Sequence, residues 1–234
     1  MHAWLIKKKN LEVCSVELWS CMIRQLLRVS VFLLGIFLMA MGVAVSIRAD
    51  LGTSPIASFP TVLSFGTSLS VGVYMILLNI VFIALQMLIL RRKFPVFQLI
   101  QLPVSIVFGL FIDLSMYLTQ WLVPGNYIEQ WVWTAVSVIL VAFGVYFEMQ
   151  PRISYLPGNG LVFTIYTKLQ NIPYGTIKTT FDTTLVVVSV VTSLLLMGQL
   201  NGVREGTVFA AITVGIVIRG ISAIHKRWGG AKSS

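Results

Sequence analysis

Six long apolar segments with almost no charged residues constrain this chain more than any other feature of its sequence. A helix needs roughly 20 mostly apolar residues to cross the hydrocarbon core of a bilayer. The segments comprise residues 29–47, 69–90, 96–118, 131–147, 179–197 and 206–224, and none contains more than one Asp, Glu, Lys or Arg. The sequence therefore predicts an all-α, polytopic membrane protein with about six transmembrane helices.

Composition argues against a soluble fold. Of the 234 residues, 57% are hydrophobic and 11% are charged, whereas soluble domains carry about 25% charged residues. The net charge of +9 comes from basic residues that lie in short clusters between the apolar segments. Such clusters are typical of topology signals and not of a nucleic-acid surface. We therefore expect the lipid bilayer as the main partner and no nucleic acid.

The basic clusters also predict the orientation of the chain. Cytoplasmic loops of membrane proteins carry an excess of Lys and Arg. If the N-terminus is cytoplasmic, 14 of the 17 Lys and Arg residues fall on that side. These are Lys7, Lys8, Lys9, Arg24, Arg28, Arg91, Arg92, Lys93, Arg152, Lys168, Lys178, Lys226, Arg227 and Lys232. We therefore expect a protein of the bacterial inner membrane with both termini in the cytoplasm.

Residues 1–28 precede the first apolar segment and are expected to form a cytoplasmic extension. Met22 begins a stretch that looks like a more natural start, so residues 1–21 are either an upstream extension or a short amphipathic leader. Cys14 and Cys21 fall on the reducing side of the membrane, and the two histidines lie near the chain ends. We therefore expect no disulfide, no metal and no cofactor.

Two shorter apolar stretches, residues 55–65 and 161–169, are interrupted by Pro or follow a Pro-Gly sequence. Each is too short to cross a bilayer. Two interpretations stay open for them. They are either re-entrant or interfacial half-helices, or ordinary loops with an amphipathic turn.

Residues that match at two adjacent offsets indicate an internal repeat; coincidence is the alternative, because Gly and Pro are common in membrane helices. Three pairs match at an offset of 102 residues: Gly42 with Gly144, Val43 with Val145, and Pro55 with Pro157. Two further pairs match at an offset of 103 residues: Gly72 with Gly175, and Asn79 with Asp182. Each half holds three spans, and an odd number makes the second half enter the membrane from the opposite side. Inverted repeats of this kind are typical of secondary transporters. The expected divisions are an extension (1–28), a first repeat (29–118), an external linker (119–130), a second repeat (131–224) and a basic cytoplasmic tail (225–234).

The stretch that ends in Ala49-Asp50-Leu51-Gly52-Thr53-Ser54-Pro55 resembles the "A-D-L-G-x-S-P" signature of the YczE/YyaS/YitT-like bacterial membrane proteins, especially the YczE branch. The resemblance continues at Phe65-Gly66-Thr67-Ser68-Leu69-Ser70-Val71-Gly72 and covers about residues 24–224. The family's "G-x-G-P-[RD]-D-G-L-M" appears here as Leu156-Pro157-Gly158-Asn159-Gly160-Leu161, so Asn159 replaces the acidic residue. The resemblance implies a multi-pass inner-membrane protein with transport as an expected role and no agreed substrate.

Charged and polar side chains inside the spans are the first candidates for function. A charge at the centre of a bilayer costs about 2.5–3.5 kcal/mol on insertion scales. Asp182 lies within the fifth segment and shares a helix face with Lys178, one turn earlier. Its repeat mate Asn79 is expected to face it, and Gln101 and Asp113 share one face of the third segment. We predict that these residues line a substrate or ion pathway; a hydrogen-bonded network that joins helices is the alternative.

The broken segments supply a second group of candidates, because a helix that starts inside the membrane presents free N–H groups that attract anions. The candidates are Arg48, Asp50, Thr53 and Ser54 at the first broken segment, and Arg152 and Asn159 at the second. The structural alternative is that Asp50 or Ser54 caps the short helix and that Arg152 pairs with Glu148.

Motifs for catalysis and ATP binding are absent from the sequence. It contains no phosphate-binding Gly-Lys-Ser/Thr loop, nucleophile elbow or zinc-protease motif, so we expect neither an enzyme nor an ATP-driven pump. The repeat favours a secondary transporter or permease for a small solute or ion that the sequence does not name. A non-transporting membrane scaffold or accessory protein that supports a partner enzyme or an envelope process is the alternative. The sequence leaves open whether the chain forms a homo-oligomer or binds another membrane protein.

Overall fold

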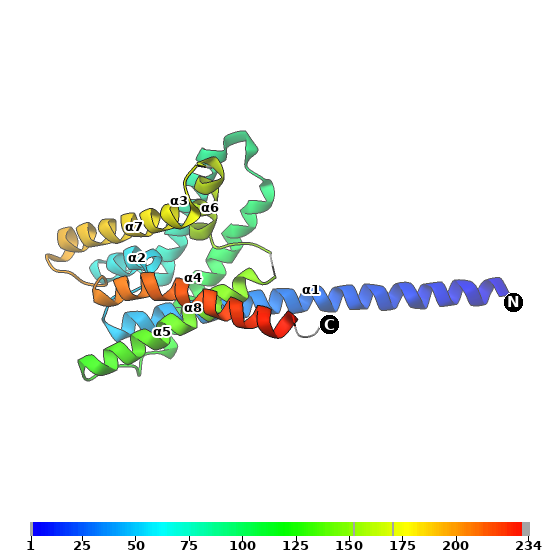
Figure 1. Ribbon diagram of the computed structural model, residues 1–234, viewed down its shortest axis with the longest axis horizontal. Helices are drawn as coiled ribbons and strands as arrows, with labels where there is room; N and C mark the ends of the chain where they lie inside the picture. The colour runs from blue at the N-terminus through cyan, green and yellow to red at the C-terminus, as the bar shows by residue number, and fades with distance from the viewer. Residues whose placement is uncertain (1, 152, 170, 231–234) are drawn as a thin grey trace.

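The computed structural model is an all-helical bundle from which helix α1 projects (Figure 1). The structure describes the backbone of residues 2–151, 153–169 and 171–230, and the side chains of these residues apart from 2–21, 219 and 222–230. The long helices are α1 (His2–Ala49), α3 (Val71–Leu90), α4 (Gln101–Leu118), α5 (Tyr127–Met149), α7 (Tyr174–Met197) and α8 (Glu205–Gly230). Two short 3₁₀ helices, η1 (Arg91–Lys93) and η2 (Val96–Ile100), lie between α3 and α4.

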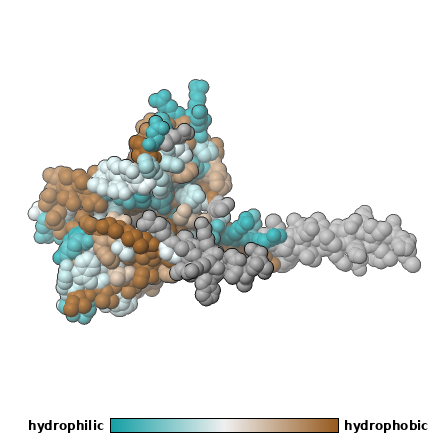
Figure 2. All heavy atoms as spheres, in the orientation of Figure 1, coloured by the Kyte–Doolittle hydropathy of each residue, from teal (hydrophilic) through white to brown (hydrophobic). Residues whose placement is uncertain are grey.

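Five helical stretches are long and apolar enough to cross a membrane: Met22–Ala49, Val71–Lys93, Val96–Leu118, Tyr127–Met149 and Tyr174–Met197. They confirm the predicted polytopic helical membrane protein. The sixth predicted span, residues 206–224, lies in α8, whose described apolar part is Glu205–Ile218. Large side chains such as Leu88, Leu110 and Leu195 are exposed, and Figure 2 shows extensive hydrophobic surface along the helices. Lipid covers a surface of this kind without the cost that water would impose.

Helices α2 (Pro55–Gly66) and α6 (Pro157–Lys168) are the two broken stretches between the spans. Both are helices rather than loops, and α6 begins four residues before the predicted stretch. Each has 12 residues, which gives about 18 Å of length and does not cross a hydrocarbon core of about 30 Å. Each begins with Pro. The fixed φ of proline suits the first helical position, and its lack of an N–H costs nothing there, because an N–H at that position would have no acceptor within the helix.

Helices α1 and α5 form the central contact of the bundle, and glycines let their backbones approach closely. A Cβ on Gly42 of α1 would lie 2.9 Å from the carbonyl oxygen of Ser137 in α5. A Cβ on Gly144 of α5 would lie 2.7 Å from the carbonyl oxygen of Gly35 in α1. Adding the repeat offset of 102 to positions 42 and 35 gives 144 and 137. The two contacts are therefore reciprocal, as contacts across a twofold axis are.

The other packing contacts largely recur between the halves. Helix α4 packs on α1 as α8 packs on α5, and α7 packs on α2 as α3 packs on α6. One contact breaks the pattern, because α3 packs along α4 whereas the described parts of α7 and α8 form no comparable contact. Helix α2 contacts both α7 and α8 instead (Figure 1). The bundle is therefore asymmetric on the side of α7 and α8.

Candidate functional site

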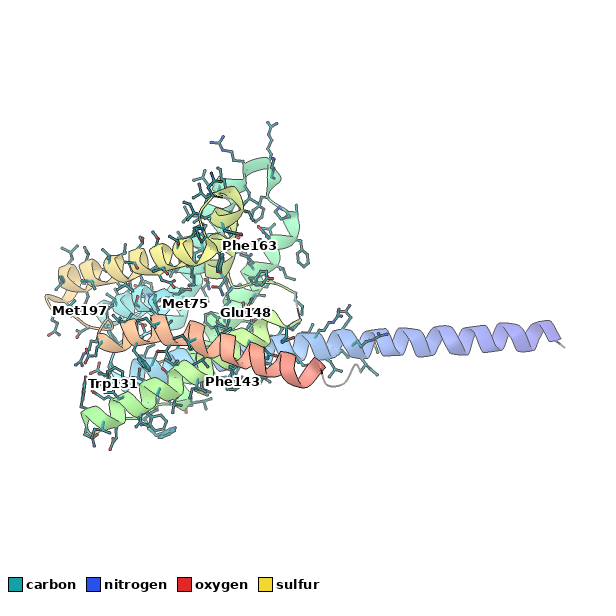
Figure 3. The ribbon with its side chains drawn as sticks, in the orientation of Figure 1. Met75, Trp131, Phe143, Glu148, Phe163 and Met197 are labelled. Carbon is teal, nitrogen blue, oxygen red and sulfur yellow. The ribbon has the colours of Figure 1, made fainter. Side chains whose placement is uncertain are left out.

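A cavity of about 270 Å³ lies inside the bundle, and every helix from α1 to α8 contributes to its wall. The polar side chains on the wall are Ser54, Asn79, Asn159, Lys178, Thr179 and Asp182. Most of the remaining wall is apolar and includes Met75, which Figure 3 labels within the bundle. A largely apolar pocket with a few convergent polar groups is the usual form of a small-molecule site.

Related positions of the two halves build this wall. Residues 102 or 103 positions apart lie on it together: Met39 and Val141, Val43 and Val145, Ile56 and Gly158, Met75 and Lys178, and Asn79 and Asp182. Lys178 of α7 thus takes the position that the Met75 thioether has in α3, and Asp182 takes the position of the Asn79 amide. The cavity combines related backbone positions with an unequal distribution of charge.

Lys178 and Asp182 form an ion pair on α7. The Lys178 Nζ lies 2.6 Å from the Asp182 Oδ1, and the side chains are 29% and 18% exposed. Residues four apart share a helix face, so α7 presents both groups to the cavity. The Lys178 Nζ also lies 5.9 Å from the centre of the Phe181 ring. Pairing neutralises both charges within the span, where an isolated charge is costly.

Asn79 of α3 lies on the same wall and is 2% exposed. Its Nδ2 donates no hydrogen bond to any described residue. Almost all buried polar groups in proteins have a partner, so the unpaired Asn79 amide is an exception. Asn79 therefore offers the cavity a free hydrogen-bond donor.

The first turns of α2 and α6 also meet the cavity. Their residues on the wall are Ser54, Pro55, Ile56 and Ala57 of α2, and Leu156, Gly158 and Asn159 of α6. Neither N-cap residue, Ser54 nor Leu156, makes a side-chain capping hydrogen bond. The first N–H groups of a helix have no acceptor within it. The positive ends of two helix dipoles therefore face the cavity.

On one side of the cavity, the N-terminal end of α3 is held against α4. Gly72 of α3 packs directly against Gly109 of α4. The Asp113 Oδ1 accepts a hydrogen bond from the Gly72 N–H at 2.9 Å, and its Oδ2 accepts one from the Ser70 hydroxyl at 2.7 Å. Asp113, a predicted pathway residue, thus holds two helices together and does not line the cavity.

The corresponding ends of α7 and α8 are apart. A Cβ on Gly175, the repeat mate of Gly72, would meet nothing within 4 Å, and the same holds for Gly215 of α8. The cavity wall includes Thr179 of α7 and Ile218 of α8 in this region. The cavity therefore extends toward the space between α7 and α8.

Gln101 lies outside the cavity wall, in a hydrogen-bonded network. The Gln86 Nε2 donates to the Gln101 Oε1 and to the carbonyl oxygen of Pro157, both at 3.1 Å. These bonds connect α3 and α4 to the start of α6. Gln86 was not among the candidates selected from the sequence, although it lies seven residues from Asn79 and therefore on the same face of α3.

Arg48, Asp50 and Thr53 lie around the turn that leads into α2. The Arg48 Nη2 donates to the carbonyl oxygen of Met116 at 3.2 Å. The Asp50 side chain is 71% exposed, and its Oδ2 lies 3.8 Å from the Arg204 Nη1. Asp50 therefore pairs with an arginine and does not cap α2, while Thr53 is buried within the turn. These three residues lie outside the cavity wall.

Glu148, near the end of α5, is a buried carboxylate, although the sequence suggested that it pairs with Arg152. Its Oε1 accepts a hydrogen bond from the Leu156 N–H at 2.7 Å, and its Oε2 has no partner among the described residues. The carboxylate thus holds the chain that leads into α6. Arg152 lies outside the described residues. No sequence pattern indicates this bond, because it joins a span to a loop without periodicity.

Comparisons with known proteins place the chain in a family. The chain is 23% identical over 133 residues to the uncharacterized protein YyaS of Bacillus subtilis (strain 168). That match covers 56% of this chain and 65% of YyaS, so the chain spans just under two thirds of that relative. It supports a YyaS-like family, whereas the YczE branch stays a prediction. No solved structure matches the chain. The model of DUF6198, a family of unknown function, matches residues 26–223, and the chain therefore belongs to that family.

Proposed function

We propose that the protein is a secondary transporter, and not an enzyme, that moves a small solute across the membrane through the cavity between its halves. One observation carries the proposal. The cavity is built from repeat-related positions, and it is flanked by helices that pack together in one half and stand apart in the other. Charged groups within a bilayer are costly and are most often functional, so the ion pair on the cavity wall favours transport over a scaffold role.

An inverted repeat is the second part of the proposal. The order of long, short, long and long helices occurs twice along the chain. The reciprocal glycine contacts between α1 and α5 support a twofold relation between the halves. Broken helices at corresponding positions are the expected location of a transporter's binding site, and α2 and α6 begin at the cavity wall.

The unequal packing of the halves determines the side of the membrane to which the cavity of the proposed transporter is open. With the N-terminus in the cytoplasm, Gly72 lies near the outer face and Gly175 near the inner face. The cavity is then closed to the outside by α3 and α4 and accessible from the cytoplasm between α7 and α8. The opposite state arises when α7 and α8 approach and α3 and α4 separate, as rocking of one repeat against the other produces.

Distance measurements between spin labels test this alternation without knowledge of the solute. We choose the exposed positions Val73 and Leu114 on α3 and α4, and their repeat mates Thr176 and Ile216 on α7 and α8. Each pair is converted to cysteine in a background without Cys14 and Cys21, labelled, and measured by double electron–electron resonance in nanodiscs. We expect two populations for each pair, and conditions that lengthen one distance should shorten the other.

A control pair within one helix, Leu77 and Leu88 of α3, should give a single narrow distance whose backbone part is about 16 Å. Single, narrow and unchanging distances at both test pairs would indicate a rigid body. That outcome supports a scaffold and contradicts transport by alternating access.

A further inference from the structure

We propose that the cavity binds a small organic monocarboxylate. Its carboxylate lies near the first turn of α2, and its apolar body lies against α1, α5 and α8. This inference rests on the proposed function, because it names the class of solute that the same cavity takes. The charge of the wall, its free donors, its apolar surface and its size carry the argument.

The charge of the wall favours one negative charge on the ligand. Lys178 and Asp182 are the only Lys, Arg, Asp or Glu among the described residues of the wall, and they neutralise each other. Of the two helix N-termini on the wall, that of α6 lies beside the buried Glu148 carboxylate, which accepts a hydrogen bond from the Leu156 N–H at 2.7 Å, whereas α2 has no acidic residue in its first turn. A helix dipole is equivalent to roughly +0.5 of an elementary charge at its N-terminus, so the start of α2 attracts a negative group on the ligand.

Asn79 and Lys178 offer the cavity hydrogen-bond donors. The Asn79 Nδ2 is buried and has no partner among the described residues. This observation does not depend on the helix termini. Lys178 has three N–H donors, of which Asp182 takes one. An ionised carboxylate accepts hydrogen bonds and donates none, so it satisfies these donors. A cationic ligand would find one carboxylate on the wall, Asp182, and the Lys178 ammonium group 2.6 Å from that carboxylate would repel the cation.

The remainder of the wall fits an apolar body of limited size. Val43, Val145, Val214, Phe108 and Ile218 present only hydrocarbon to the cavity. The volume of about 270 Å³ falls below the roughly 300–1,000 Å³ typical of pockets for drug-sized ligands. A short-chain organic acid therefore matches the site better than an inorganic anion, which would leave the apolar wall without a partner.

Binding of three probes of equal length tests the charge preference. Butyrate, butyramide and butylammonium are titrated into the full-length protein in nanodiscs by isothermal calorimetry. We expect butyrate to bind at least tenfold more tightly than the other two. Equal or tighter binding of butyramide or butylammonium, or no binding of straight-chain acids from acetate to hexanoate, would overturn the inference.

Substitutions locate the carboxylate. Lys178→Met should weaken butyrate binding at least tenfold, and Lys178→Arg, which keeps the charge, should change it by less than threefold. Lys168→Met is the control, because Lys168 is exposed on α6 and donates to the carbonyl oxygen of Ile89, away from the cavity. If Lys178→Met does not fold, K178M/D182N removes both charges and leaves no unpaired acid. Unchanged butyrate binding in the folded variant overturns the inference.

Uptake of labelled solutes into proteoliposomes separates this inference from the transporter proposal. Butyrate binding without uptake of any probe keeps the site and contradicts transport. Uptake of butyramide or butylammonium without butyrate binding keeps transport and contradicts the carboxylate site. Uptake of butyrate that Lys178→Met abolishes and Lys168→Met preserves supports both.

Discussion

Asp182 and Asn79 occupy related positions on α7 and α3 but differ in their hydrogen-bond partners. The Asp182 carboxylate has a partner on its own helix, at 2.6 Å from the Lys178 Nζ. The Asn79 amide has an unsatisfied donor and no such partner among the described residues. A neutral amide costs less to bury than a charge, so α3 tolerates Asn79 without a charged partner. The two halves thus contribute different chemistry from the same position.

Glu148 gives a prediction at the scale of one residue. Its Oε1 is the acceptor for the Leu156 N–H at the start of α6. Glu148→Leu removes this acceptor and leaves a buried N–H group unpaired, which should lower the free energy of unfolding by about 1–3 kcal/mol. Glu148→Gln keeps an acceptor oxygen and should lose less than about 1 kcal/mol. Thermal unfolding in detergent, followed by tryptophan fluorescence, measures both changes.

Glu129 supplies the control for this measurement. It is exposed near the opposite end of the same helix, where it accepts hydrogen bonds from the Gly125 N–H at 2.8 Å and the Asn126 Nδ2 at 3.0 Å. Glu129→Gln keeps one acceptor oxygen and removes a charge from the first turn, so it should lower stability by about 0.3–1 kcal/mol. If Glu148→Leu and Glu148→Gln lose the same stability, the hydrogen bond to Leu156 does not hold the start of α6.

The contact between α1 and α5 gives a prediction at the scale of the element. A methyl group on Gly42 would lie 2.9 Å from the Ser137 carbonyl oxygen, which belongs to backbone and cannot rotate away. Gly42→Ala should therefore separate the helices and lower stability by about 1–3 kcal/mol. Gly144→Ala should do the same, since its contact with Gly35 is the reciprocal one. Unfolding temperature and the yield of monodisperse protein report the effect.

Gly215→Ala is the matched control for both substitutions. A Cβ at this position meets nothing within 4 Å, and alanine favours a helix by up to about 1 kcal/mol relative to glycine. We expect stability to be unchanged or slightly higher. If Gly42→Ala is as stable as Gly215→Ala, close approach of α1 and α5 is not required by the fold.

Orientation in the membrane belongs to the scale of the whole molecule. The excess of Lys and Arg on one side predicts that both termini are cytoplasmic. Val123, between α4 and α5, and Arg92, in η1, then lie on opposite sides of the membrane. In a background without Cys14 and Cys21, a membrane-impermeant maleimide added to intact cells should label Val123→Cys and not Arg92→Cys.

Permeabilised cells supply the control, because both positions are exposed and should react. Labelling of Arg92→Cys alone from outside reverses the orientation. In that case the proposed opening between α7 and α8 would face the exterior and not the cytoplasm.

The sequence by itself determined the class of protein and the positions of its helices. The thickness of the hydrocarbon core sets the length of a span, and lipid requires that length to be apolar, so each span can be recognised locally. Pro55 and Pro157 mark the starts of the two short helices because proline suits a first helical position. The repeat also related Asn79 to Asp182, and both lie on the cavity wall.

Only the tertiary structure decided which polar faces meet the cavity. Gln101 and Asp113 share a face of their helix by periodicity, but that face packs on α3. Periodicity assigns residues to a face and carries no information about the neighbour of that face. The bond from Glu148 to Leu156 and the gap between α7 and α8 depend in the same way on how separate helices are placed. Contacts between distant segments arise from packing in three dimensions, which no local pattern encodes.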